Sequence, residues 1–299
     1  MPKPSSPDYS QPKTPDDIIA VLRAIAESNC IIIGGQAVNI WSMMLGNERE
    51  EPWASQQPFT SIDADGLGDL NSLVNLATAL QGEGYAVELD EAKPPDQTRI
   101  NTGQILVTSP QLNISINIIH NPIGLRAPEI IQTAQSIKFR KLTLKVLHPL
   151  LCVESKAVCL VELRQDNPKE PRQDKKHLIL AMANLNVFLK NLGDHNPAGA
   201  IYFADRVRGL AVDQYGIRIL RQHKIDVLDA VPWQEWGQSP NTVLSDFAKT
   251  YAEVVKDRTA AIDHERKARE WIERLKSAAP SRPGKAQRGQ KSRRSSHQK

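Results

Sequence analysis

The sequence has few cysteines and no long apolar segment. Cys30, Cys152 and Cys159 are its three cysteines in 299 residues, too few and too scattered for a disulfide framework or a zinc site. A low cysteine content is typical of proteins in a reducing compartment. We therefore expect a cytoplasmic protein. No apolar run approaches the ~18–20 residues of a transmembrane helix, and no apolar signal segment follows the first residue. We therefore expect no membrane partner.

The excess of positive charge is confined to the C-terminal end of the chain. The chain has 38 basic and 34 acidic residues, but residues 276–299 hold eight Lys or Arg and no Asp or Glu. Residues 1–275 therefore have a net charge of −4, and the excess of positive charge belongs to the tail. Residues 277–299 lack apolar periodicity and are rich in Ser, Gly, Gln and Pro, which predicts disorder. The tail is either solvated or an arm that tethers RNA.

Two kinds of regular structure are expected along the chain. Five of the first 15 residues are proline, so residues 1–13 are interpreted as a disordered leader. From 14 to 148, short β-branched runs alternate with helical periodicity, which predicts an α/β domain built on a mixed sheet with flanking helices. From 149 to 276 helical patterns dominate, which predicts a helical domain. The fold class expected for the whole chain is α+β.

Individual strands and helices are predicted from hydrophobic periodicity and from the Gly and Pro residues that end them. On one expected strand, Ile114, Ile116 and Ile118 face one way, whereas Asn113 and Asn117 face the other. The expected strands cover residues 30–33, 59–65, 85–89, 100–108 and 112–119, with a hairpin at 136–149. The expected helices cover residues 18–28, 37–46, 67–80, 150–164, 174–191, 197–211, 214–230 and 239–276.

Two short motifs have chemical meaning. Gly34 and Gly35 lie between an expected strand and helix, where glycine lets backbone N–H groups approach phosphate oxygens closely. Asp63 and Asp65 lie two residues apart on an expected strand, so both carboxylates point to one face. Such a pair can bind Mg²⁺ or Mn²⁺ together with substrate phosphates, and stabilise an in-line displacement of pyrophosphate. The alternative for the aspartates is a solvated strand end before Gly66.

The order strand, glycine pair, helix and D-x-D strand resembles the nucleotidyltransferase (polymerase β-like) superfamily. The chain looks most like the AbiEii-type toxin nucleotidyltransferases, and the likeness spans roughly residues 17–190. The resemblance implies an NTP substrate, with nucleotide-binding residues in the glycine segment including Gln36. It also implies that Lys156, on the helix after Pro149, offsets the triphosphate charge. The residues in motif positions are Gly34, Gly35, Ala37, Thr60, Asp63 and Asp65.

The chain departs from this pattern at two acidic positions. Asn117 lies where the family has a third catalytic carboxylate, and His177 occupies a later acidic position. An asparagine offers an amide oxygen to a metal but cannot act as a base. Ser115 and His120 are nearby candidates for partial replacement. Lys156 has the alternative of a solvated helix lysine.

Two interpretations of function remain. One is an active Mg²⁺- or Mn²⁺-dependent transferase with Asp63, Asp65 and Asn117 at its catalytic centre. The resemblance then implies a toxin-like action on RNA, with tRNA as the acceptor. The other is a degenerate fold that binds nucleotide, RNA or a protein partner without chemistry. A third hypothesis makes the chain one subunit of a toxin–antitoxin pair, whose antitoxin partner supplies the missing group.

Overall fold

A computed structural model describes residues 8–9, 11–46, 59–91, 101–163, 165 and 172–278. Of the expected leader, residues 1–7 and 10 lie outside this set, as does the expected tail beyond Ala278. Residues up to Arg258 form one compact unit, and those from Thr259 onward form a second. The boundary expected between residues 148 and 149 falls inside the first unit.

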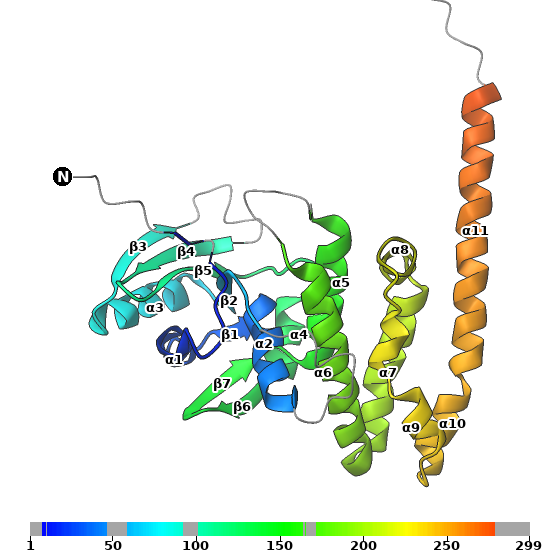
Figure 1. Cartoon of the computed structure of the whole chain (residues 1–299), viewed down its shortest axis with the longest axis horizontal. Coiled ribbons are helices and arrows are strands. Elements are labelled where there is room, and N and C mark those ends of the chain that lie inside the picture. Colours follow the sequence, from blue (N-terminus) through cyan, green and yellow to red (C-terminus); the bar gives the residue numbers. More distant parts are fainter. Residues whose placement is uncertain are drawn as a thin grey trace, which may run out of the picture. The chain divides into compact units, whose positions relative to one another are not determined.

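The described strands form one mixed sheet (Figure 1). The inner strands β1, β2 and β5 are short and β-branched or glycine-containing, as suits strands covered by helices. Strand β1 pairs antiparallel with β2 and parallel with β7, whereas β2 pairs parallel with β5. The strand order is β3-β4-β5-β2-β1-β7-β6, with bounds β1 Ile31–Ile33, β2 Asp63–Leu67, β3 Ala86–Glu91, β4 Asn101–Thr108, β5 Asn113–Ile119, β6 Gln135–Phe139 and β7 Leu142–Val146.

Helices pack on the sheet and then on one another. Helices α1 and α3 contact each other and the strands, while α2 packs between the sheet and the helices α5 and α6. The bounds are α1 Ile19–Glu27, α2 Gly34–Leu45, α3 Leu70–Gly82, α4 Ala127–Thr133, α5 Pro149–Glu162, α6 Asp174–His195, α7 Pro197–Val212, α8 Gln214–His223, the 3₁₀ turn η4 Val227–Ala230, α9 Trp233–Gly237, α10 Thr242–Lys249 and α11 Tyr251–Ala278.

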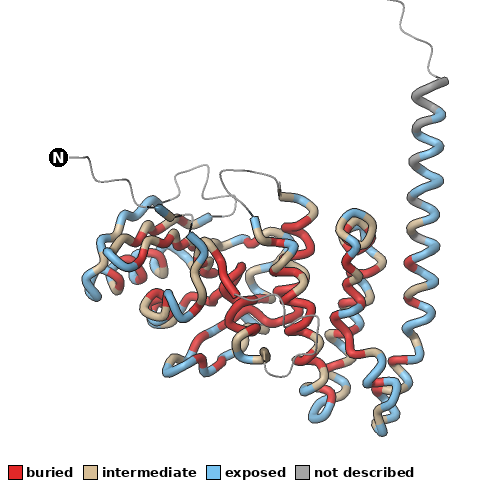
Figure 2. Tube along the Cα trace, in the orientation of Figure 1, coloured by how far each residue is buried: buried red, intermediate tan, exposed pale blue. Residues whose placement is uncertain are grey.

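The hydrophobic core is continuous from the sheet into the helices that follow it. Figure 2 shows buried residues along the central strands and through α5 and α6. Ile114, Ile116 and Ile118 are fully buried, and the alternate residues of β5 are less buried, as the alternation predicted. The expected α+β class is confirmed. None of the helices in the described part of the chain has the length and apolar character needed to cross a membrane.

Several element boundaries differ from expectation. Helix α2 begins at Gly34, so the glycines form its first turn. Strand β2 begins at Asp63 and continues through Leu67, because Gly66 and Leu67 pair with both β1 and β5. The helix expected at 214–230 is interrupted at Lys224, whose φ of 59° is left-handed. The helix expected at 239–276 is divided near Thr250, and α4 and α9 had not been expected.

Candidate functional site

A cavity of about 170 Å³ lies where β2, α2, α5 and α6 meet. The first turns of both α2 and α6 contribute to its wall. Free N–H groups and the helix dipole make such N-terminal turns favourable for anions. The lining residues are Gly35, Ser61, Ile62, Asp63, Asp65, Lys156, Arg172, Gln173, Asp174 and His177.

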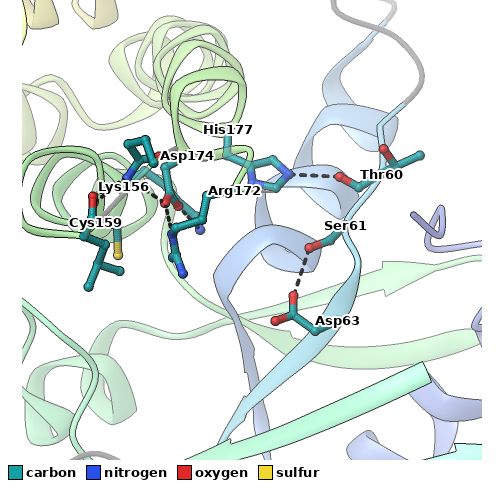
Figure 3. A network of polar contacts seen from close by, with 10 residues as sticks. Thr60, Ser61, Asp63, Lys156, Cys159, Arg172, Asp174 and His177 are labelled. Carbon is teal, nitrogen blue, oxygen red and sulfur yellow. Dashed lines mark hydrogen bonds and ion pairs between the residues drawn. The ribbon is translucent and has the colours of Figure 1, made fainter. Parts of the chain in front are cut away.

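The two aspartates of β2 form an acidic wall of this cavity. Asp63 and Asp65 both line it, which confirms that they lie on one face of the strand. The Ser61 hydroxyl donates to Asp63 Oδ1 at 3.2 Å (Figure 3). Asn117 on β5 lies directly opposite Asp65 in the parallel register. Its Nδ2 donates to Asp65 Oδ1 at 3.0 Å and to Asp63 Oδ2 at 3.4 Å.

The glycine pair allows this wall to approach α2. Gly34 has a φ of 65°, and a Cβ at this position would lie 2.1 Å from Asp65 Oδ2. A Cβ on Gly35 would lie 2.4 Å from Ser61 Oγ and 2.7 Å from His177 Cε1. Only glycine therefore fits at both positions. The pair brings the N-terminal turn of α2 against the Asp65 carboxylate and into the cavity.

Asp65 ionises less readily than an ordinary aspartate. Burial and then the neighbouring Asp63 carboxylate raise the pKa of Asp65 to about 7. The hydrogen bond from Asn117 and the charges of Lys156 and Arg172 oppose this shift only in part. A cation bound between the two carboxylates would remove the repulsion that raises this pKa.

A basic wall lines the same cavity and lies across from Asp63 in Figure 3, with Lys156 on α5 and Arg172 just before α6. Lys156 Nζ lies 3.1 Å from Asp174 Oδ1, and Arg172 Nε lies 2.6 Å from Asp174 Oδ2. Burial alone would raise the pKa of Asp174, but Lys156 and Arg172 outweigh it and lower that pKa to about 2. Burial likewise opposes the charge of Lys156, yet Asp174 holds its pKa above the ordinary value. Lys156, Arg172 and Asp174 therefore carry a net charge of +1.

The two cations of this wall differ in exposure. The Lys156 side chain is 9% exposed, so the alternative of a solvated lysine is wrong. The Arg172 side chain is 37% exposed and binds Asp174 through Nε. Its remaining guanidinium nitrogens are therefore the ones positioned to meet a ligand in the cavity.

His177 joins the two walls as a neutral group. Burial, together with the nearby Lys156 charge, lowers the pKa of His177 to about 3. The neutral ring lies with Nε2 3.0 Å from the carbonyl oxygen of Thr60, so Nε2 carries the proton and donates. His177 thus ties the first turn of α6 to the segment that precedes β2.

The remaining residues predicted for the site lie outside the cavity lining. Gln36 is buried, and its Nε2 donates to the backbone oxygen of Lys13 at 3.2 Å. Thr60 takes part through its backbone oxygen. Ser115 accepts a hydrogen bond from Gln104, and His120 lies 3.4 Å from the Thr102 hydroxyl.

Sequence reasoning assigned no role in the site to Ser61 or Gln104, and Arg172 and Asp174 entered only as the basic and acidic helix start that the family resemblance implies. Asp174 had a usable signal, because an acidic residue at the start of a predicted helix is a common helix-terminus feature. Gln104 had none, because its role depends on which strands are neighbours and in which register they pair.

The oxygen ligands available suit a hard divalent cation. Asp63 and Asp65 offer carboxylate oxygens on one face, the ligand type that Mg²⁺ and Mn²⁺ prefer. Within the residues that the structure describes, no three His, Cys, Asp or Glu side chains form a group able to hold a metal ion. Among the described residues, the two aspartates are therefore the carboxylate ligands that such an ion would have, and neutral oxygens of the protein, the substrate or water would complete its shell.

Comparison with known proteins adds little to this geometry. No protein-family model matches the chain, and no curated protein matches it. Among solved structures, the chain is similar to one described as the crystal structure of JHP933 from Helicobacter pylori, with a TM-score of 0.33 and 11% identity. The match covers 87% of this chain and 95% of that one. A likeness this weak supports no conclusion about function.

Proposed function

We propose that the protein transfers a nucleotide from an NTP to an acceptor hydroxyl in a reaction that depends on Mg²⁺ or Mn²⁺. The observation that supports this proposal is that one cavity has two aspartates on one wall and Lys156 and Arg172 on the facing wall. Carboxylates alone suit a cation, and basic groups alone suit a phosphate. Both together suit a metal–triphosphate complex.

The proposed reaction is a single in-line displacement. An oxygen of the acceptor hydroxyl attacks the α-phosphorus of the NTP, the bond from that phosphorus to the bridging oxygen breaks, and pyrophosphate leaves. Asp63 and Asp65 would hold the Mg²⁺ or Mn²⁺ ion, which would supply charge stabilisation during the displacement. Arg172 and the N-terminal turns of α2 and α6 bind the phosphates. Lys156 keeps Asp174 ionised and thereby orients Arg172.

The acceptor follows from the family resemblance alone. We propose RNA, with tRNA as its class, and the basic tail as an accessory contact to the phosphate backbone. We also propose that an antitoxin partner would inhibit the protein by covering this cavity. The proton of the acceptor hydroxyl passes to water, because Asn117 cannot take it.

The second candidate is a nucleotide-binding module without chemistry. It is favoured by one observation: Asn117 donates hydrogen bonds to both aspartates from the position of the family's third carboxylate. Such a protein would use the same cavity for binding alone.

Transfer of radiolabel distinguishes the two candidates. The full chain is incubated with each α-labelled NTP, total RNA and excess Mn²⁺ or Mg²⁺, and label in RNA and in protein is measured on gels. Asp65→Asn should lower transfer by about 10²-fold or more, since it removes a group that stabilises transition-state charge. Asp90→Asn, on the exposed strand β3, is the matched control and should transfer label like wild type. Absence of transfer with all four NTPs would refute the transferase. Nucleotide binding that is lost in Arg172→Gln would then favour the binding module.

A further inference from the structure

Three polar side chains form a row across three neighbouring strands. Gln104 on β4 lies opposite Asn117 on β5, and Asn117 lies opposite Asp65 on β2. Gln104 Nε2 donates to Asn117 Oδ1 at 3.2 Å and to Ser115 Oγ at 2.8 Å. Asn117 Nδ2 in turn donates to both aspartates. Both amides are therefore oriented the same way, with the nitrogen of each donating toward the acidic wall.

This direction decides what Asn117 offers to a cation. Its oxygen is engaged by Gln104, and its N–H groups face the two carboxylates where a cation would bind. For the amide oxygen to face the cation, the Asn117 amide must turn over. Its Nδ2 would then face Gln104 Nε2, and two donors cannot hydrogen-bond to each other. Asn117 can therefore turn only if Gln104 also turns.

Ser115 makes the second arrangement feasible. A hydroxyl can donate as well as accept, so a turned Gln104 would accept with Oε1 from both Ser115 Oγ and Asn117 Nδ2. Both arrangements keep the hydrogen bonds that join Gln104 to Ser115 and to Asn117. They differ in whether Asn117 presents N–H groups or an oxygen to Asp63 and Asp65.

We infer that Gln104 is a positioning residue for cation binding: Gln104 and Asn117 turn over together when a divalent cation binds Asp63 and Asp65. The inference rests on the proposed function only in that a divalent cation binds the two aspartates. In the first arrangement the Asn117 N–H groups hold the carboxylates together. In the second, the Asn117 oxygen becomes a further ligand of the cation. Positioning groups of this kind commonly change metal affinity by 10–100-fold.

A residue at position 104 that only accepts hydrogen bonds tests the coupling. In Gln104→Glu, the carboxylate can only accept from Asn117 Nδ2, so the Asn117 oxygen is held toward the aspartates before the cation binds. Mn²⁺ affinity is measured on the full chain at about pH 8 from the electron paramagnetic resonance signal of free Mn²⁺. We expect Gln104→Glu to bind Mn²⁺ about tenfold more tightly than wild type. Circular dichroism and thermal unfolding check that the variant folds.

The added charge is separated from the turned amide by a double-mutant cycle. In an Asn117→Ala background, Gln104→Glu should improve Mn²⁺ affinity less than about twofold if it acts through Asn117. An equal gain in both backgrounds would mean that the new charge acts alone, and would overturn the inference. No gain in Gln104→Glu, or no Mn²⁺ binding by it or by wild type, would overturn it as well. Failure of the transferase proposal is seen separately, as Mn²⁺ binding without any transfer of label.

Discussion

Asp65 and Asp174 line the same cavity, yet their environments move their pKa values in opposite directions. Burial and Asp63 raise the pKa of Asp65 to about 7. Asp174 is also buried, but Lys156 and Arg172 lower its pKa to about 2. The charges of the neighbouring groups therefore account for the difference, since a carboxylate lies beside Asp65 and two cations contact Asp174. Burial acts on both residues in the same sense.

The difference between the two pKa values reflects the opposite charges of the two cavity walls. On the basic wall, two cations neutralise one aspartate, and the excess positive charge faces the cavity through Arg172. On the acidic wall, two carboxylates share the N–H groups of one amide. The basic wall is thus suited to a phosphate, whereas the acidic wall is suited to a divalent cation.

The largest effect should come from removing the buried cation of the basic wall. Lys156→Ala leaves the Asp174 charge buried with Arg172 as its only cation, so the free energy of unfolding should fall by about 4 kcal/mol. Urea denaturation followed by circular dichroism measures it. Lys190→Ala, which breaks the exposed Lys190–Glu235 pair, is the matched control and should cost less than about 1 kcal/mol. Equal losses in the two variants would show that the buried pair has no special role.

A smaller effect should come from the glycine beside the acidic wall. Gly34→Ala places a Cβ against Asp65 Oδ2 at a residue with φ of 65°, so it should destabilise the fold by about 3 kcal/mol. Gly209→Ala, inside α7 where a Cβ meets nothing within 4 Å, should instead stabilise it by about 0.5–1 kcal/mol. Thermal unfolding of both variants gives the comparison. A stable Gly34→Ala protein would contradict the close approach of α2 to Asp65.

The smallest effect is a change in the pH dependence of stability. The native state keeps the Asp65 proton up to about pH 7, whereas an unfolded aspartate loses it near its ordinary pKa of 3.8. The free energy of unfolding contributed by Asp65 therefore falls as pH rises from about 4 to about 7. In metal-free buffer, the free energy of unfolding of Asp65→Asn should therefore rise relative to wild type between about pH 4 and about pH 7.

Asp174→Asn is the matched control with the opposite sign. The pKa of Asp174 is depressed to about 2, so its stabilisation is present above an ordinary pKa of 3.8 and is lost as pH falls toward 2. Asp174→Asn should therefore destabilise the protein at neutral pH, with a penalty that shrinks on acidification. Parallel pH dependences in the two variants would contradict the contrast between the walls.

Much of the acidic wall could be predicted from sequence, because local periodicity determines it. The D-x-D spacing places Asp63 and Asp65 on one face, and the isoleucine alternation assigns Asn117 to the polar face of β5. The basic wall could be predicted only in part. Lys156 was a candidate, but its pairing with Asp174 joins two helices through tertiary contacts that no periodicity reports.

Other errors have a common physical cause. Helical periodicity continues across Lys224, yet this residue adopts a left-handed conformation that side-chain pattern does not reveal. The row from Gln104 to Asp65 depends on strand register, which a single sequence does not specify without its turns and partners.

The parallel pairing of β1 with β7 has a consequence for synthesis on the ribosome. Ile32 acquires its partner Val146 only after more than one hundred further residues have been made. The aspartates of β2 emerge early, whereas α6, which completes the cavity, follows later still. Because such non-local contacts form slowly, a nascent chain has its two carboxylates long before it has the basic wall that faces them. The cavity can therefore form only after α6 has left the ribosome.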